Sequence, residues 1–139
     1  MSSTTPAEQL LLELLAIPSV SGTEAAVVDW LAHRLETNFV ITRIPAGDDR
    51  DSLLCLRGTP RVLLCAHIDT VPGVVAVRTN ETAIFGRGAC DNKGAAAAMI
   101  VTAEDAAHNG QQDFGLLFTV GEETTFDGAM AVAKYFEEQ

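Results

Sequence analysis

An unbroken apolar run, Val62-Leu63-Leu64-Cys65-Ala66, limits the folds that this chain can adopt. A strand with one face in water alternates apolar and polar residues, whereas a strand covered on both faces is apolar throughout. A second apolar strand is predicted over 115–120, and an alanine-rich helix over 95–107 separates the two. We therefore expect an α/β fold in three layers, with helices on both faces of a mostly parallel central sheet.

The remaining segments complete this pattern. Leucines at helical spacing predict a first helix over 7–16, which ends before Pro18 because the residue preceding a proline avoids the α region. The other predicted elements are helices over 25–35 and 126–136, strands over 39–44, 52–56 and 61–66, and a short hairpin formed by 74–78 and 83–85. With 139 residues and neither repeats nor a linker, the chain is expected to form one domain.

Charge and composition narrow the possible partners. The chain is 47% hydrophobic and 20% charged, which is typical of a folded soluble protein. Its formal net charge of −10 disfavours binding to nucleic acid and to anionic membrane surfaces, and it favours cations. Apolar runs fall short of the roughly 20 residues that span a membrane, and Met1 to Ala7 lacks the pattern of a secretory signal. A cytoplasmic protein is therefore expected.

The three cysteines indicate neither a disulfide framework nor a thiolate zinc site. Cys55, Cys65 and Cys90 are widely spaced, odd in number and without a CxxC motif. Cys55 and Cys65 stand in apolar strand runs, where we expect them to be buried as small apolar residues.

Candidate functional residues follow the predicted strands. His67-Ile68-Asp69 comes directly after one strand, Glu122-Glu123 after another, and Asp91 precedes the alanine-rich helix. In an open α/β sheet, binding sites form beyond the carboxyl ends of the strands, so these side chains are expected to share one crevice. Imidazole and carboxylate ligands without thiolates favour Zn²⁺, with Co²⁺ or Mn²⁺ as alternatives. Asp69, two residues from His67, is placed to fix the imidazole.

Each of these residues also has an ordinary structural explanation. His67 could be a histidine whose hydrogen bonds are satisfied at a strand end, and Asp91 could be a helix N-cap. Glu122 and Glu123 could form a solvated acidic turn. Adjacent carboxylates can also face different ways, one towards a metal and the other towards a water molecule, as a hydrolytic site requires.

Three spaced motifs resemble the M20 metallopeptidase family. They are 64–72 (LCAHIDTVP), 86–94 (GRGACDNKG) and 121–123 (GEE), and the opening segment 17–24 (IPSVSGTE) is similar to the N-terminal signature of that family. The family includes acetylornithine deacetylase, succinyl-diaminopimelate desuccinylase, aminoacylases and carboxypeptidases. The resemblance implies a zinc-exopeptidase-like fold and spans essentially the whole chain.

The resemblance also implies a role for each site residue. His67 would bind one metal, Asp91 would bridge two, and Glu123 would bind the second, with zinc as the expected ion. Glu122 would be the general base and Asp69 would orient His67. Two cations would make a water molecule between them more acidic, and Glu122 would take its proton and later protonate the leaving amine.

Members of this family are more than twice as long as this chain. The resemblance therefore implies that residues 1–139 form the N-terminal portion of the catalytic domain, without the lid and dimerisation domain or the C-terminal part. A further acidic ligand and a histidine ligand would be missing, so each metal would keep two protein ligands here instead of the three that a catalytic zinc usually has. We expect low activity from this chain alone, and self-association, with a homodimer as the expected form, through exposed apolar edges.

Several functions stay open at this point. Residues 86–98 (GRGACDNKGAAAA) are most similar to acetylornithine and acetylcitrulline deacetylases, which predicts hydrolysis of an N-acyl amino acid in arginine biosynthesis. Succinyl-diaminopimelate desuccinylase, a dipeptidase or a carboxypeptidase is the alternative within the family. A non-catalytic metal-binding or interaction domain of the same fold is another, and a plain structural α/β domain with acidic loops is the last.

Overall fold

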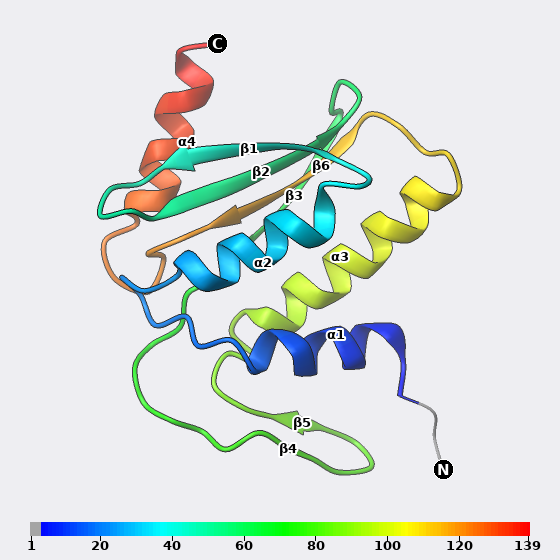
Figure 1. The fold of residues 1–139 in the computed structure, drawn as a ribbon, viewed down its shortest axis with the longest axis vertical. Helices are drawn as coiled ribbons and strands as arrows, with labels where there is room; N and C mark the ends of the chain where they lie inside the picture. The colour runs from blue at the N-terminus through cyan, green and yellow to red at the C-terminus, as the bar shows by residue number, and fades with distance from the viewer. Residues whose placement is uncertain (1–3) are drawn as a thin grey trace.

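A computed structural model describes residues 4–139 and contains the predicted elements in the predicted order (Figure 1). They are α1 (Pro6–Leu15), α2 (Ala25–Leu35), β1 (Val40–Pro45), β2 (Asp51–Arg57), β3 (Val62–His67), β4 (Arg78–Thr79), β5 (Ile84–Phe85), α3 (Lys93–His108), β6 (Phe114–Thr119) and α4 (Asp127–Glu137). The predicted bounds of α2 agree with the structure, and those of the other helices differ by one or two residues. None of the helices within 4–139 is both long and apolar enough to cross a membrane.

The central sheet has the order β1-β2-β6-β3, and it is mixed where a mostly parallel sheet was predicted. Only β3 and β6 pair in parallel, while β1 with β2 and β2 with β6 are antiparallel. The five-residue link 46–50 explains the first antiparallel pair, because a short connection permits a hairpin and a parallel pair needs a crossover. The parallel pair has such a crossover, since α3 connects β3 to β6.

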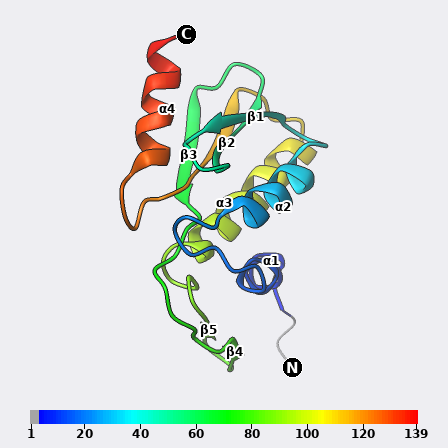
Figure 2. The same ribbon diagram turned by 60° about the vertical axis from the view of Figure 1, so that its left-hand side comes forward.

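Helices cover both faces of the sheet, as predicted. Figure 2 shows α4 on one side of the strands and α2 and α3 on the other, while α1 packs on α3. The larger core lies between the sheet and these three helices, and it includes Leu14, Leu31, Ile100 and Phe118. A smaller core of Ile44, Leu54, Leu117 and Val132 lies under α4.

The strand β3 forms an edge of the sheet and is less covered than its apolar sequence predicted. Val62 is 55% exposed and Leu64 is 36% exposed, and Cys65 is exposed as well. Cys55, in the interior strand β2, is buried as expected. The prediction for Cys65 is wrong because β6 lies on only one side of β3.

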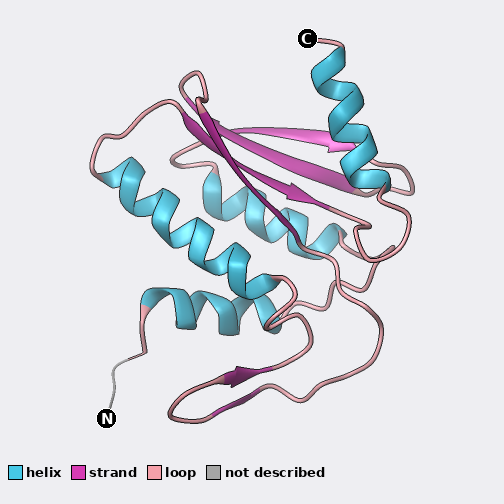
Figure 3. Ribbon diagram, turned by 180° about the vertical axis from the view of Figure 1, so that it is seen from behind, coloured by secondary structure: helices cyan, strands magenta, loops and turns pink. Residues whose placement is uncertain are grey.

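A short hairpin, β4 and β5, lies apart from the main sheet, next to α1 in Figure 3. Each strand has two residues, so the strands predicted over 74–78 and 83–85 are shorter than expected. Residues 74–77 are not a strand, and Val74 is 99% exposed. Asn80 closes the turn by accepting hydrogen bonds from the amides of Thr82 and Ala83 at 2.9 and 2.8 Å.

The parallel pair fixes the position of the site. His67 at the end of β3 is the sheet partner of Thr119 at the end of β6. The loops that follow both strands therefore leave the same edge of the sheet next to each other, which is where binding sites form in folds of this kind.

Candidate metal centre

His67 is buried at the end of β3, with 9% of its surface exposed, and each ring nitrogen has a partner. Nε2 lies 2.8 Å from Oδ1 of Asp91, and Nδ1 lies 3.1 Å from the backbone carbonyl of Asp69. When Nδ1 carries the proton and donates it to that carbonyl, Nε2 is left with a free lone pair. This is the tautomer that a metal ligand requires.

Burial and charge act in opposite directions on His67. Burial favours the neutral ring and lowers its pKa, whereas the hydrogen bond to Asp91 and the charges of Glu122, Asp69 and Asp91 raise it. The net effect is a raised pKa. His67 therefore sits in a strongly negative environment, which also attracts metal cations.

Asp91 lies in the loop before α3 and is not its N-cap. Asn92 holds the cap position, and no side chain caps the helix. The carboxylate of Asp91 is 70% exposed and reaches across to His67. The N-cap explanation for Asp91 is therefore wrong.

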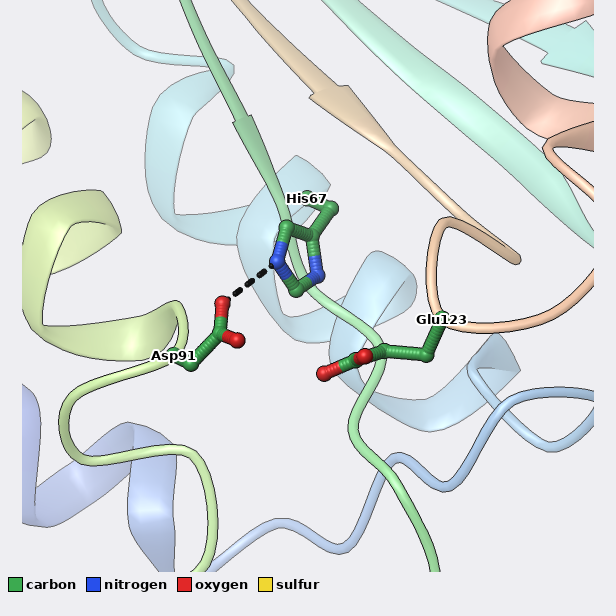
Figure 4. A group of neighbouring side chains, drawn as sticks. All are labelled: His67, Asp91 and Glu123. Atoms are coloured by element: carbon green, nitrogen blue, oxygen red, sulfur yellow. Dashed lines mark hydrogen bonds and ion pairs between the residues drawn. The ribbon is translucent and has the colours of Figure 1, made fainter.

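Glu122 and Glu123 follow β6 and bring two more carboxylates to this place. Oε2 of Glu122 lies 3.6 Å from Nε2 of His67. One potential ligand atom each from His67, Asp91 and Glu123 lies within 4.8 Å of the others, and Figure 4 shows the three side chains converging from three segments. Burial, together with the charges of Asp91, Glu122 and Asp69, raises the pKa of Glu123, and His67 opposes this.

Asp69 is fully buried beneath this group and holds its backbone. Its two carboxylate oxygens accept hydrogen bonds from the amides of Glu122 and Glu123 at 3.1 and 3.0 Å. The hydroxyl of Ser21 donates a third at 2.6 Å. The carboxylate also lies 3.3 Å from Nδ1 of His67, so Asp69 contacts the imidazole as predicted and shares that role with its own backbone carbonyl.

Lys93 and Glu24 are buried charged residues near the site to which the sequence assigned no such place. The ammonium of Lys93 is 2% exposed and donates to the carbonyls of Leu14 and Ile17 at 3.0 and 2.6 Å, and burial lowers its pKa to about 8. It ties the start of α3 to the end of α1. Glu24, predicted as part of a turn and cap, is fully buried and hydrogen-bonded to the amide of Gly121. A charged residue next to a site motif was the only available signal, and only Lys93 carried it.

These groups define a class of protein. An imidazole and several carboxylates meet at the carboxyl ends of two parallel strands, and no cysteine belongs to the group within 4–139. Nitrogen and oxygen ligands of this kind, with a further carboxylate beside them, are typical of metal-dependent hydrolases.

Comparison with known families agrees with that class. The sequence model of peptidase family M20/M25/M40 matches residues 63–139, which is more than half of the chain and includes all the site residues described above. The chain belongs to this family, whose members are metal-dependent hydrolases.

Known relatives cover most of the chain. A protein of Aspergillus clavatus named "Probable carboxypeptidase" is 35% identical over 136 residues, which are 86% of this chain and 30% of the relative. N-acetyl-L-citrulline deacetylase of Xanthomonas campestris pv. campestris is 36% identical over 113 residues, which are 76% of this chain and 30% of the relative. The chain thus spans less than a third of the length of either relative.

A solved structure supports the fold. A tripeptidase from Staphylococcus aureus superimposes with a TM-score of 0.80 at 22% identity, over 91% of this chain and 39% of the tripeptidase chain. The predicted α/β architecture with helices on both faces is confirmed by this likeness.

Proposed function

We propose that this chain carries the N-terminal portion of the catalytic domain of a metal-dependent amidohydrolase, with His67, Asp91 and Glu123 as metal ligands. The observation that supports this most directly is the approach of their three ligand atoms to within 4.8 Å of one another. They come from three segments that are far apart in the sequence, so their meeting is a property of the fold.

The donor set suits zinc, with cobalt or manganese as alternatives. Imidazole nitrogen and carboxylate oxygen are accepted by all three ions, and zinc is the usual choice for hydrolysis with such ligands. A complete site would hold two ions, one with His67 and Asp91 and the other with Asp91 and Glu123. Two protein ligands per ion are fewer than the usual three, so we propose weakened metal binding and low activity for this chain alone.

The side chains of the site divide the hydrolysis of an amide between them. When bound, the metal polarises the amide carbonyl and makes water a stronger acid. Glu122 accepts a proton as the water oxygen attacks the carbonyl carbon, and it delivers this proton to the nitrogen as the carbon–nitrogen bond breaks. Asp69 keeps His67 and the backbone of Glu122 in place throughout.

The proposed substrate is an N-acyl amino acid of the acetylornithine or acetylcitrulline type, as in arginine biosynthesis. Residues 86–98 support this, as does the 36% identity to an N-acetyl-L-citrulline deacetylase. A carboxypeptidase or dipeptidase reaction is the alternative, and the similarity to the Aspergillus protein favours it. We also propose a cytoplasmic location, which agrees with three unpaired cysteines within 4–139.

Calorimetric titration of zinc into the metal-free chain tests the metal site. We expect binding that the substitution Asp91→Ala abolishes. Asp105→Ala is the matched control, because it removes the same charge from an exposed position on α3 and should leave binding unchanged. Absence of zinc binding to the unsubstituted chain would refute a preformed site.

Complementation separates an enzyme from a non-catalytic relative of the same fold. The chain would be mixed with the separately produced remaining part of a full-length relative, and deacetylation of N-acetylornithine would be followed. We expect activity that Glu122→Gln removes. A complex that forms and binds zinc without any hydrolysis would favour the non-catalytic interpretation.

A further inference from the structure

Three consecutive amides in the loop after β6 are each held by a buried carboxylate. The amide of Gly121 donates to Oε1 of Glu24 at 3.0 Å. The next two amides, of Glu122 and Glu123, donate to Asp69. The backbone of the loop is therefore fixed from below by two acidic side chains from elsewhere in the chain.

Glu24 makes an extensive set of contacts for a residue outside the site motifs. Its side chain is fully buried, and Oε2 accepts a hydrogen bond from the amide of Gly22 at 2.9 Å. Nη1 of Arg50 lies 3.4 Å from Oε1. A buried carboxylate is costly unless it is paired and hydrogen-bonded, and here both conditions are met.

Arg50 connects Glu24 to the far end of the same loop. It comes from the turn between β1 and β2, and its side chain is 8% exposed. Its guanidinium contacts Glu24 on one side and the carboxylate of Asp127, the first residue of α4, on the other. The loop begins at Gly121 and ends at Asp127, so this ion network grips both ends of it.

The loop is also closed within itself. The carbonyl of Gly121 accepts a hydrogen bond from the amide of Phe126 at 2.8 Å. Gly121 has φ of +68°, and any side chain there would collide with the carboxylate of Asp127. Backbone shape and side-chain network thus require each other.

We propose that Glu24, supported by Arg50 and Asp127, is a positioning residue for the catalytic loop. It holds the amide of Gly121 so that Glu122 and Glu123 face His67 and Asp91 before any ligand binds. The importance of this role rests on the proposed function, because the loop carries the proposed general base and one proposed metal ligand. Glu24 itself does not touch the reacting atoms.

Amide hydrogen exchange of the metal-free chain tests this role without using zinc. Glu24→Gln preserves the shape of the side chain but replaces one acceptor oxygen with a donor and removes the counter-charge of Arg50. We expect amides 121–123 to lose about tenfold or more of their protection, while those of α3 and β6 change less. Glu104→Gln is the control, since it neutralises a carboxylate that pairs with Arg34 between α2 and α3.

Zinc titration of the same variants provides the second measurement. Glu24→Gln should weaken zinc binding by about tenfold relative to Glu104→Gln, because the loop must then be ordered at the expense of binding. If even the unsubstituted chain binds no zinc, the proposed function fails, and hydrogen exchange still decides the role of Glu24.

Two results would overturn the proposal. One is unchanged protection at 121–123 in Glu24→Gln, and the other is an equal loss across the loop, α3 and β6. If Glu24→Gln does not fold, Asp127→Asn replaces it, because that carboxylate is 29% exposed and contacts the same arginine. It should reduce the protection of 121–123 selectively, and a uniform change would again contradict a positioning role.

Discussion

Asp69 stabilises the site mainly through the backbone of other residues. Its carboxylate accepts the amides of Glu122 and Glu123, and it contacts Nδ1 of His67 from the same buried position. The residue connects the end of β3 with the loop after β6, so it sets the distance between the imidazole and the acidic side chains. The substitution of this one residue should therefore affect the whole group.

Asp69→Asn should destabilise the fold and weaken zinc binding together. An asparagine offers one acceptor oxygen and one amino group, so one of the two loop amides loses its acceptor and faces a donor. We expect a loss of about 1–3 kcal/mol in the free energy of unfolding, measured by urea titration.

Asp29→Asn is the matched control for that substitution. Asp29 is 67% exposed and pairs with Arg43 on the surface, where an ion pair contributes about 1 kcal/mol or less. Equal losses in both variants would show that Asp69 has no special place.

Asp127 should make stability depend on pH in acid. The hydrogen bond from Arg50 outweighs burial and lowers the pKa of Asp127 below 3.8. Because the folded pKa lies below the unfolded one, the stabilisation is complete above about pH 4 and is lost as the pH falls through the folded value.

Asp127→Asn tests this dependence, and the readout is its difference in unfolding free energy from the unsubstituted chain. The difference should be about 1–2 kcal/mol near pH 6 and should shrink towards about pH 2. A difference that stays constant over that range would contradict the role of the ion pair.

The sequence was sufficient to find the residues that face the site, but not those that hold them. His67, Glu122 and Glu123 could be located because they follow apolar strands directly. Glu24 lies 97 residues from its partner Gly121, and neither local spacing nor a motif connects them. Long-range pairs of this kind depend on the sheet order, which a single sequence does not provide.

Among the secondary structure elements, the strand-helix-strand unit β3-α3-β6 is what the sequence predicted best. Its two apolar strands and its alanine-rich helix follow from residue patterns alone. The insertion of β6 between β2 and β3 could not be predicted, because it pairs strands that are distant in the chain. For the same reason the exposure of β3 at the edge was missed.

Gly121→Ala should disrupt the junction between β6 and α4. The residue has φ of +68° and its side chain would meet Asp127, so backbone strain and a steric collision add up. We expect a loss of about 2–4 kcal/mol in the free energy of unfolding, measured by urea titration.

Gly110→Ala is the control for that junction. Gly110 has φ of +78°, but a side chain there would meet nothing within 4 Å. It should cost only the strain of the left-handed conformation, about 1 kcal/mol. If the two variants lose the same stability, close packing at Gly121 contributes nothing.

For the whole molecule, the open edge of β3 predicts self-association. Val62 and Leu64 are exposed on a strand that pairs on one side only, and such edges pair readily with another chain. We expect a dimer or larger assembly in sedimentation velocity at high protein concentration.

Val62→Lys should shift that assembly towards the monomer, because a charge on an edge strand opposes pairing with a second copy. Val74→Lys introduces the same side chain at a position that is 99% exposed in the loop after β3 and should leave the assembly unchanged. A chain that sediments as a monomer at every concentration would refute this prediction.

The way in which the loop after β6 is held has a consequence for redesign. Asp69 and Glu24 grip amide groups, which every residue except proline possesses, so the shape of the loop does not depend on the side chains at 122 and 123. Those two positions can therefore be varied together while the scaffold beneath them stays the same. A library at 122 and 123 would search for new chemistry with little risk to folding.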